Sequence, residues 1–215
     1  DCSLFFSSMT KAMASFAETA DPLCYRHDTE ALTGELSRQL LGIKCIVSPD
    51  SIRLTFGFSN AVLLALQSCC SRGDVAAVEC PGLCDYYFAA KLYGIQLLPI
   101  RSDPETGLDL DELERAASRT PRLRCIICAP NFSNPTGSLM PPERKRRLAA
   151  FCVKNDIVII ENDLVGDFCY SGARPVPVKS LAPEQVIYIS AIAGSMSNVC
   201  YISGGRFHKK LKTLA

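Results

Sequence analysis

A polar turn at residues 131–137, Asn-Phe-Ser-Asn-Pro-Thr-Gly, carries side chains that could bind a ligand. It follows the apolar run 124–130 and precedes a charged segment, 141–155, that is typical of a helix. In an open α/β sheet, ligands bind where strands end and helices begin, because side chains and helix N-termini converge there. Asn134 is therefore the first candidate for a ligand contact. The local alternative is an ordinary turn stabilised by Asn and Gly, in which Pro135 fixes one φ angle.

A second candidate is the Gly-Phe-Ser-Asn segment at residues 57–60, between a predicted strand and a predicted helix. Phe58, Ser59 and Asn60 would form the amino end of that helix. Free N–H groups and the helix dipole favour an anion such as phosphate there. The alternative is that Ser59 caps the helix. The local sequence leaves both interpretations open.

The cysteines do not indicate a metal site. The chain has 12 of them, and many lie inside apolar runs, where thiols behave as small core residues. We therefore expect reduced thiols and a cytoplasmic location. Cys125 and Cys128 have the spacing of a metal or redox pair, but in a strand their side chains point to opposite faces. Because His27 and His208 are the only histidines, no zinc site is predicted.

The composition favours small-molecule or protein partners. The chain has 215 residues and a net charge of +1, which gives no general attraction to nucleic acid or to anionic membranes. Its apolar runs are strand-sized and shorter than the roughly 20 residues that span a bilayer. The first residues, Asp-Cys-Ser-Leu-Phe-Phe, lack the basic lead of a signal peptide. Since no initiator Met is present, we expect a trimmed or fragmentary chain.

Strands and helices are predicted to alternate along the chain. The expected strands are 51–56, 74–79, 95–100, 123–128, 157–161 and 186–190, and the expected helices include 8–20, 29–41 with Thr29 as its cap, 109–118 and 141–155. In the last helix, Arg144, Lys145, Arg146 and Arg147 are interpreted as a solvated face. This alternation predicts an α/β fold with a doubly wound, mostly parallel sheet. We expect residues 1–45 to form an N-terminal helical segment and residues 46–215 the large domain.

Several blocks, taken together, resemble a known family. They are residues 54–61, 73–81, 131–137 and 160–168, followed by 172–175 and 204–207. In order and spacing they are similar to the large domain of fold-type I pyridoxal-phosphate enzymes, the class I/II aminotransferases. The likeness is closest to the aminotransferase-like domains of MocR-type (GntR-family) proteins. It implies an incomplete large domain that lacks the small C-terminal domain and the DNA-binding winged helix.

The resemblance also implies roles for particular positions. A lysine after one strand forms the Schiff base, an aspartate pairs with the pyridine nitrogen, and an aromatic ring stacks on the cofactor. The phosphate lies on the helix start at Phe58 and Ser59, and Asn134 hydrogen-bonds the 3′ oxygen. The positions that the resemblance places around the cofactor are Phe58, Ser59, Asn60, Leu83, Asn134, Asn162, Val165, Ser190 and Ser195.

This sequence departs from the family at the reactive positions. Asn162 replaces the pyridine partner, Val165 a tyrosine and Leu83 the stacking ring. The lysine position falls on Gly194 when counted from the strand, or on Asn198 when matched to the Ser-x-Ser motif. No lysine stands in either register, and no arginine for the substrate carboxylate precedes residues 204–206. We therefore predict no catalytic residue.

The leading hypothesis is a catalytically inactive aminotransferase-like protein. It would bind pyridoxal phosphate or an amino-acid-like ligand weakly and without a covalent bond, and would act as a homodimer or with a partner subunit. One alternative is a truncated or mis-spliced fragment of an active aminotransferase, or an enzyme whose lysine comes from a partner chain. Another is the effector-sensing module of a MocR-type regulator. No nucleic-acid or membrane partner is predicted for this chain.

Overall fold

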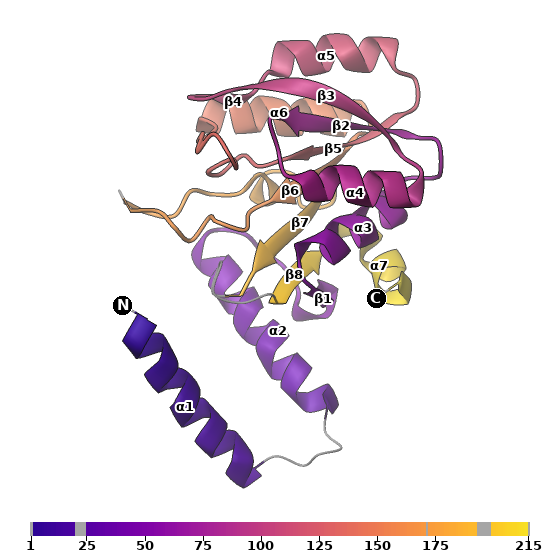
Figure 1. Ribbon diagram of the computed structural model, residues 1–215. Coiled ribbons are helices and arrows are strands. Elements are labelled where there is room, and N and C mark those ends of the chain that lie inside the picture. The colour runs from indigo at the N-terminus through magenta and orange to yellow at the C-terminus, as the bar shows by residue number, and fades with distance from the viewer. Residues whose placement is uncertain (1, 20–24, 171, 193–198, 215) are drawn as a thin grey trace.

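The centre of the molecule is an eight-stranded sheet with the order β1-β8-β7-β6-β5-β2-β3-β4 (Figure 1). The computed structural model describes residues 2–19, 25–170, 172–192 and 199–214. Strands β2, β3, β5, β6 and β7 are parallel, whereas β8 is antiparallel to both β7 and β1, and β4 is antiparallel to β3. The strands are β1 (Ile52–Phe56), β2 (Val75–Cys80), β3 (Gln96–Asp103), β4 (Gly107–Leu108), β5 (Leu123–Cys128), β6 (Val158–Asn162), β7 (Val186–Ala191) and β8 (Val199–Ser203). The predicted α/β fold with a mostly parallel sheet is confirmed.

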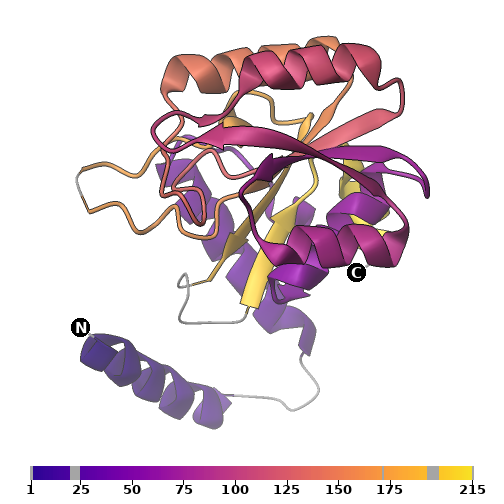
Figure 2. The ribbon, with the colours of Figure 1, turned by 45° about the horizontal axis from the view of Figure 1, so that its top comes forward.

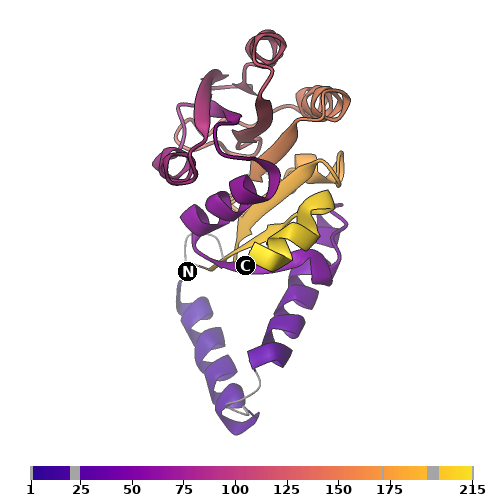
Figure 3. The ribbon, with the colours of Figure 1, turned by 90° about the vertical axis from the view of Figure 1, so that its right-hand side faces the viewer.

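Helices cover both faces of the sheet (Figures 2 and 3). One core lies between the sheet and α2, α5 and α6, and the other between the sheet and α3, α4 and α7. The helices are α1 (Cys2–Thr19), α2 (Tyr25–Gly42), α3 (Phe58–Cys69), α4 (Cys84–Tyr93), α5 (Leu110–Arg119), α6 (Pro142–Lys154) and α7 (His208–Leu214). Short 3₁₀ turns are η1 (Pro49–Ser51), η2 (Val178–Ser180) and η4 (Gly205–Phe207).

Strand residues alternate between the two cores. In β5, Cys125 and Ile127 belong to the core under α3 and α4, while Ile126 and Cys128 belong to the core under α5 and α6. All four are fully buried, as expected for a parallel sheet that is covered on both sides. The prediction that Cys125 and Cys128 point to opposite faces is therefore confirmed.

Some predicted boundaries are wrong. Helix α2 begins at Tyr25, so Thr29 lies inside the helix and not at its cap. Helix α1 begins at Cys2, and β3 continues to Asp103. Strand β8 was not predicted, because its five residues fall in the segment read as the lysine loop. It is fixed by pairing on both sides, with β7 and β1, which a local pattern does not reveal.

Helix α1 lies apart from the sheet (Figures 1 and 3). Its apolar side chains Leu4, Phe6, Met9 and Met13 are exposed. Within the described residues, no helix combines the length and apolar character that a membrane crossing requires. The division of the chain at residue 45 stays a prediction.

Candidate functional site

The predicted site residues come from the carboxyl ends of the parallel strands and from the amino end of α3. Strands β2, β5, β6 and β7 are neighbours in parallel register, so the residues that follow them share one edge of the sheet. This edge is where ligands bind in open α/β sheets. The contacts below show which of the predicted residues meet there.

Asn162, the last residue of β6, is hydrogen-bonded entirely within the protein. Its Nδ2 donates to Tyr86 Oη at 2.8 Å, and its Oδ1 accepts from the Leu164 N–H at 3.1 Å. Tyr86 is buried, and burial raises the pKa of its phenol well above the usual range. Its ring meets Phe58 edge-on, with 5.9 Å between centroids. Phe58, Tyr86 and Asn162 thus form one packed group between α3, α4 and β6.

Asp163 points to the other face and is the centre of a buried polar cluster. Its carboxylate accepts from Tyr188 Oη at 2.6 Å and from Asn131 Nδ2 at 3.0 Å, and it pairs with Arg174 Nη2 at 3.0 Å. Burial raises the pKa of Asp163, and the opposing effect of Arg174 does not cancel this. Ser190 Oγ donates to the Asp163 carbonyl at 3.0 Å, which places Ser190 beside this cluster.

Our sequence reasoning missed the Asp163 cluster. Asp163 and Arg174 both lie in the blocks that carry the family resemblance, but the sequence gives no sign that they pair. The alternation of side chains between the two faces of a strand could have indicated that Asp163 needs a partner such as Arg174. If Asn162 faces α3 and α4, then Asp163 must face the opposite side, and a buried carboxylate there requires donors.

Lys145 adds a further contact to this cluster and corrects the predicted solvated face. It is buried, and its Nζ donates to Asn131 Oδ1 and to the Val176 carbonyl, the latter at 2.9 Å. Burial lowers the pKa of its amine. Arg147 does lie on an exposed face, where it pairs with Glu114 at 2.9 Å. The prediction was wrong for Lys145 because consecutive residues of a helix point to different sides. One member of a run of basic residues can therefore face the protein interior.

The amino end of α3 already has a carboxylate next to it. The N-cap is Gly57, at φ 82°, a conformation that favours glycine, so the alternative that Ser59 caps the helix is wrong. Ser59 Oγ instead donates to Asp85 Oδ1, from the first turn of α4. Asn60 Oδ1 accepts from the Phe56 N–H at 3.3 Å. An anion at this helix end would therefore compete with Asp85.

Two buried glutamates hold the loops beside the site. Glu79, at the end of β2, accepts from Ser133 Oγ at 2.9 Å and from the Ala129 N–H at 2.7 Å, which anchors the polar turn. Glu161 accepts from the N–H groups of Val178 and Lys179, both at 2.7 Å. Burial, followed by the charge of Asp163, raises the pKa of Glu161 to about 7.

The remaining predicted residues are placed as follows. Asn134 is exposed on the turn, which the Ser133 N–H closes by donating to the Ser138 carbonyl at 3.0 Å. Leu83 is half-buried at the start of α4, and Val165 is half-buried after β6. Gly194, Ser195 and Asn198 lie outside the described residues. Roles for all these residues in cofactor binding stay predictions.

The residues present do not fit pyridoxal phosphate in its catalytic use. That chemistry needs an acid beside the pyridine nitrogen, so that the ring can take up electrons. The residue that the resemblance assigns to this position is an amide, Asn162, whose hydrogen bonds go to Tyr86 and Leu164. The resemblance assigns the stacking position to Leu83, which has no aromatic ring, and the Asp85 carboxylate would repel an anion at α3.

Comparisons with known proteins agree with this fold. A model of the family "Aminotransferase class I and II" matches residues 28–205. The uncharacterized HTH-type transcriptional regulator YjiR of Escherichia coli (strain K12) is 34% identical over 187 residues, which cover 84% of this chain and 39% of that protein. Valine–pyruvate aminotransferase of Mycobacterium tuberculosis (strain ATCC 25618 / H37Rv) is 31% identical over 127 residues, which cover 59% of this chain and 32% of that protein. This chain thus spans less than half the length of either relative.

A solved structure gives the same result for the backbone. N-succinyldiaminopimelate aminotransferase from Mycobacterium tuberculosis superposes with a TM-score of 0.80 at 19% identity, over 97% of this chain and 56% of that one. At this identity the likeness shows the fold.

Proposed function

Because the chain belongs to the class I and II aminotransferase family, we propose that it is a member of that family that does not catalyse transamination. It uses the family's large-domain fold to bind small molecules non-covalently and to associate with other proteins. The observation that carries this proposal is the state of Asn162. Its amide donates to Tyr86 Oη and accepts from the Leu164 N–H, so it makes the contacts of a structural residue. An amide has no acidic proton to share with a pyridine nitrogen at neutral pH.

The buried lysines support the proposal. Lys179 Nζ donates to the carbonyls of Pro183 and Val186, at 2.6 Å and 2.7 Å, and Val186 is the first residue of β7. This amine therefore lies at the amino edge of the sheet, opposite to the candidate site. Lys145 lies nearer the site, but Asn131 and Val176 accept its hydrogen bonds and it is 5% exposed. Both amines donate hydrogen bonds to acceptors of the protein, which disfavours their attack on an aldehyde.

Association through α4 is part of the proposal. Tyr87, Phe88 and Leu92 of this helix are exposed, and so is Phe56 at the end of β1. Phe88 and Leu92, four residues apart, lie on one face of α4, and large apolar side chains exposed on one face are typical of an interaction surface. A homodimer or a partner subunit would cover them. Sedimentation equilibrium of the purified chain tests this part, and a monomer at all concentrations would contradict a homodimer.

The test of the main proposal is a search for a Schiff base. The purified chain is mixed with pyridoxal phosphate, reduced with borohydride and digested for mass spectrometry. We expect no stoichiometric adduct on any single lysine, and only scattered low-level labelling of exposed amines. A complete adduct on one lysine, Lys145 included, would refute the proposal.

A second candidate function is the effector-sensing module of a transcriptional regulator. The observation that favours it is the 34% identity to the HTH-type regulator YjiR over most of this chain. In that case a small molecule should stabilise the chain without being converted. Thermal shift with a panel of amino acids, with product analysis in parallel, separates this candidate from an enzyme.

A further inference from the structure

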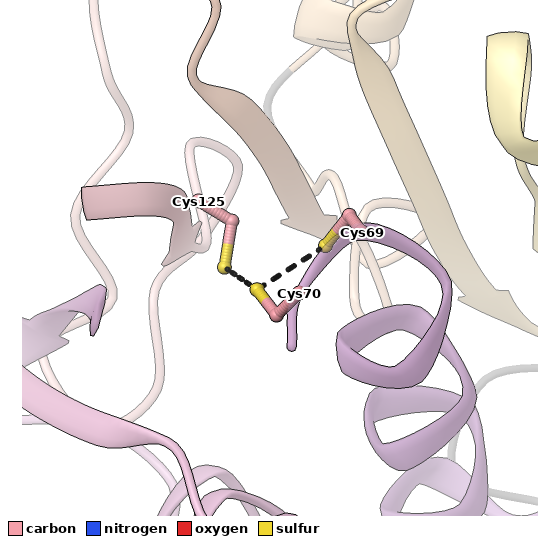
Figure 4. Close-up of side chains that lie close together, drawn as sticks. All are labelled: Cys69, Cys70 and Cys125. Carbon is pink, nitrogen blue, oxygen red and sulfur yellow. Dashed lines mark hydrogen bonds between the residues drawn. The ribbon is translucent and has the colours of Figure 1, made fainter. Parts of the chain in front are cut away.

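Three thiols from distant parts of the sequence meet at the end of α3 (Figure 4). Cys69 is the last residue of α3, Cys70 follows it, and Cys125 lies in β5. The sulfur of Cys70 lies 3.5 Å from that of Cys125 and 3.7 Å from that of Cys69. All three sulfurs lie within 4.8 Å of one another.

These separations match those of sulfur ligands around one metal ion. A zinc ion bonds thiolate sulfur at about 2.3 Å, and in a tetrahedral arrangement two such sulfurs are about 3.8 Å apart. The two closest sulfur pairs here are 3.5 Å and 3.7 Å apart, so a metal ion needs only small shifts of the side chains.

The three cysteines differ in burial. Cys70 and Cys125 are buried, while Cys69, at the end of α3, is half-buried. Among the charged groups near Cys70, Lys210 of α7 is positive and Asp74 is negative. Three thiolates and a divalent cation leave one negative charge, which the Lys210 ammonium partly offsets.

We propose that Cys69, Cys70 and Cys125 form a binding site for a thiophilic divalent metal ion of the zinc class, with three thiolate ligands and one open position. On binding, three S–H protons leave to solvent and three metal–sulfur bonds form. The site is distinct from the candidate site at the carboxyl edge of the sheet. It lies at the opposite end of the 12-residue helix α3, which is about 18 Å long.

The experiment is an anaerobic titration of the reduced full chain with Co²⁺, followed by displacement with Zn²⁺. Sulfur-to-cobalt charge-transfer absorption counts the thiolates, and the visible bands report the coordination number. We expect one equivalent of Co²⁺ with three thiolates, displaced by one equivalent of Zn²⁺. Cys69→Ser, Cys70→Ser and Cys125→Ser should each weaken binding by at least about a hundredfold, since each removes one of three bonds in a site whose total affinity is large.

The matched control is Cys128→Ser, which changes a buried cysteine of the same strand on the opposite face. It should bind Co²⁺ as the unchanged chain does. Because Cys69 is half-buried, Cys69→Ser is the variant that best retains the fold, and circular dichroism verifies this. The proposal is overturned if the unchanged chain gives no charge-transfer band, if folded Cys69→Ser binds as tightly as the unchanged chain, or if Cys128→Ser loses binding equally.

Discussion

Removing the Asp85 charge is predicted to create a better anion site at the amino end of α3. In the present structure the Asp85 carboxylate accepts a hydrogen bond from the Ser59 hydroxyl. A phosphate at this helix end would need the same donor. Asp85→Asn keeps the size of the side chain and removes its negative charge. Phosphate and pyridoxal phosphate should then bind more tightly to the free N–H groups at this helix end.

The expected gain follows from Coulomb's law. A phosphate that takes the Ser59 hydroxyl would lie about 5 Å from the Asp85 carboxylate, a separation at which two unit charges repel by about 0.8 kcal/mol in water. The repulsion doubles for a phosphate dianion, so removal of the charge is worth about 1–2 kcal/mol. This corresponds to a roughly five- to thirty-fold gain in affinity.

Isothermal calorimetry with inorganic phosphate and with pyridoxal phosphate, at low ionic strength, measures this gain. Glu105→Gln is the control, because it makes the same change in net charge at an exposed position on another part of the surface. Ser59→Asp should abolish binding by adding a second carboxylate. If Asp85→Asn and Glu105→Gln give the same affinity, the local repulsion that we infer does not exist.

Three further predictions concern Tyr86, Glu161 and the predicted lysine position. Tyr86→Phe should lower the free energy of unfolding by about 1–3 kcal/mol, because it leaves the buried Nδ2 of Asn162 without an acceptor. Urea titration measures this loss, with Tyr87→Phe as the control at an exposed tyrosine. Equal changes for the two variants would contradict the prediction. Glu161 has a folded pKa of about 7, above its ordinary value of 4.5, so its contribution to stability is present below pH 4.5 and is lost as the pH rises to 7, by roughly 3 kcal/mol. Glu161→Gln should flatten the decline in unfolding free energy over that window, and an unchanged slope would mean that other groups cause it. Asn198→Lys should not restore transamination, and adding Asn162→Asp should improve cofactor retention more than rate, because the reacting groups act as a unit. Half-transamination assays measure both effects. Turnover by Asn198→Lys alone within about a hundredfold of a typical enzyme's roughly 10 per second would refute the prediction.

Most of the sheet could be predicted from the sequence, because each central strand is a short apolar run between turn signals. The parallel order then follows from the alternation of strands and helices. Strand β8 could not be predicted in this way. Its five residues form a strand because β1 and β7 offer free edges on both sides, and such pairing between distant segments leaves no local pattern.

The sequence predicts which strand ends and which helix start the candidate residues occupy, but not which residues they contact. Strand ends and the start of α3 mark the edge where Asn134, Asn162 and Ser59 lie. The contacts join residues that are far apart in sequence: Asn162 and Tyr86 are 76 positions apart, and Cys70 and Cys125 are 55 apart. The burial of Lys145 depends likewise on acceptors in two loops, Asn131 and Val176.

The anchoring of loops by Glu79 and Glu161 has a consequence for how this sequence can diverge. Each carboxylate sits at the end of a buried strand and fixes a loop through backbone N–H groups, which are present whatever the loop's side chains are. Residues between these anchor points that make no buried polar contact, Val165 among them, can therefore be exchanged by drift without loss of the sheet. A lineage that no longer needs the reaction can lose its reactive side chains one at a time, while selection for folding keeps the two glutamates.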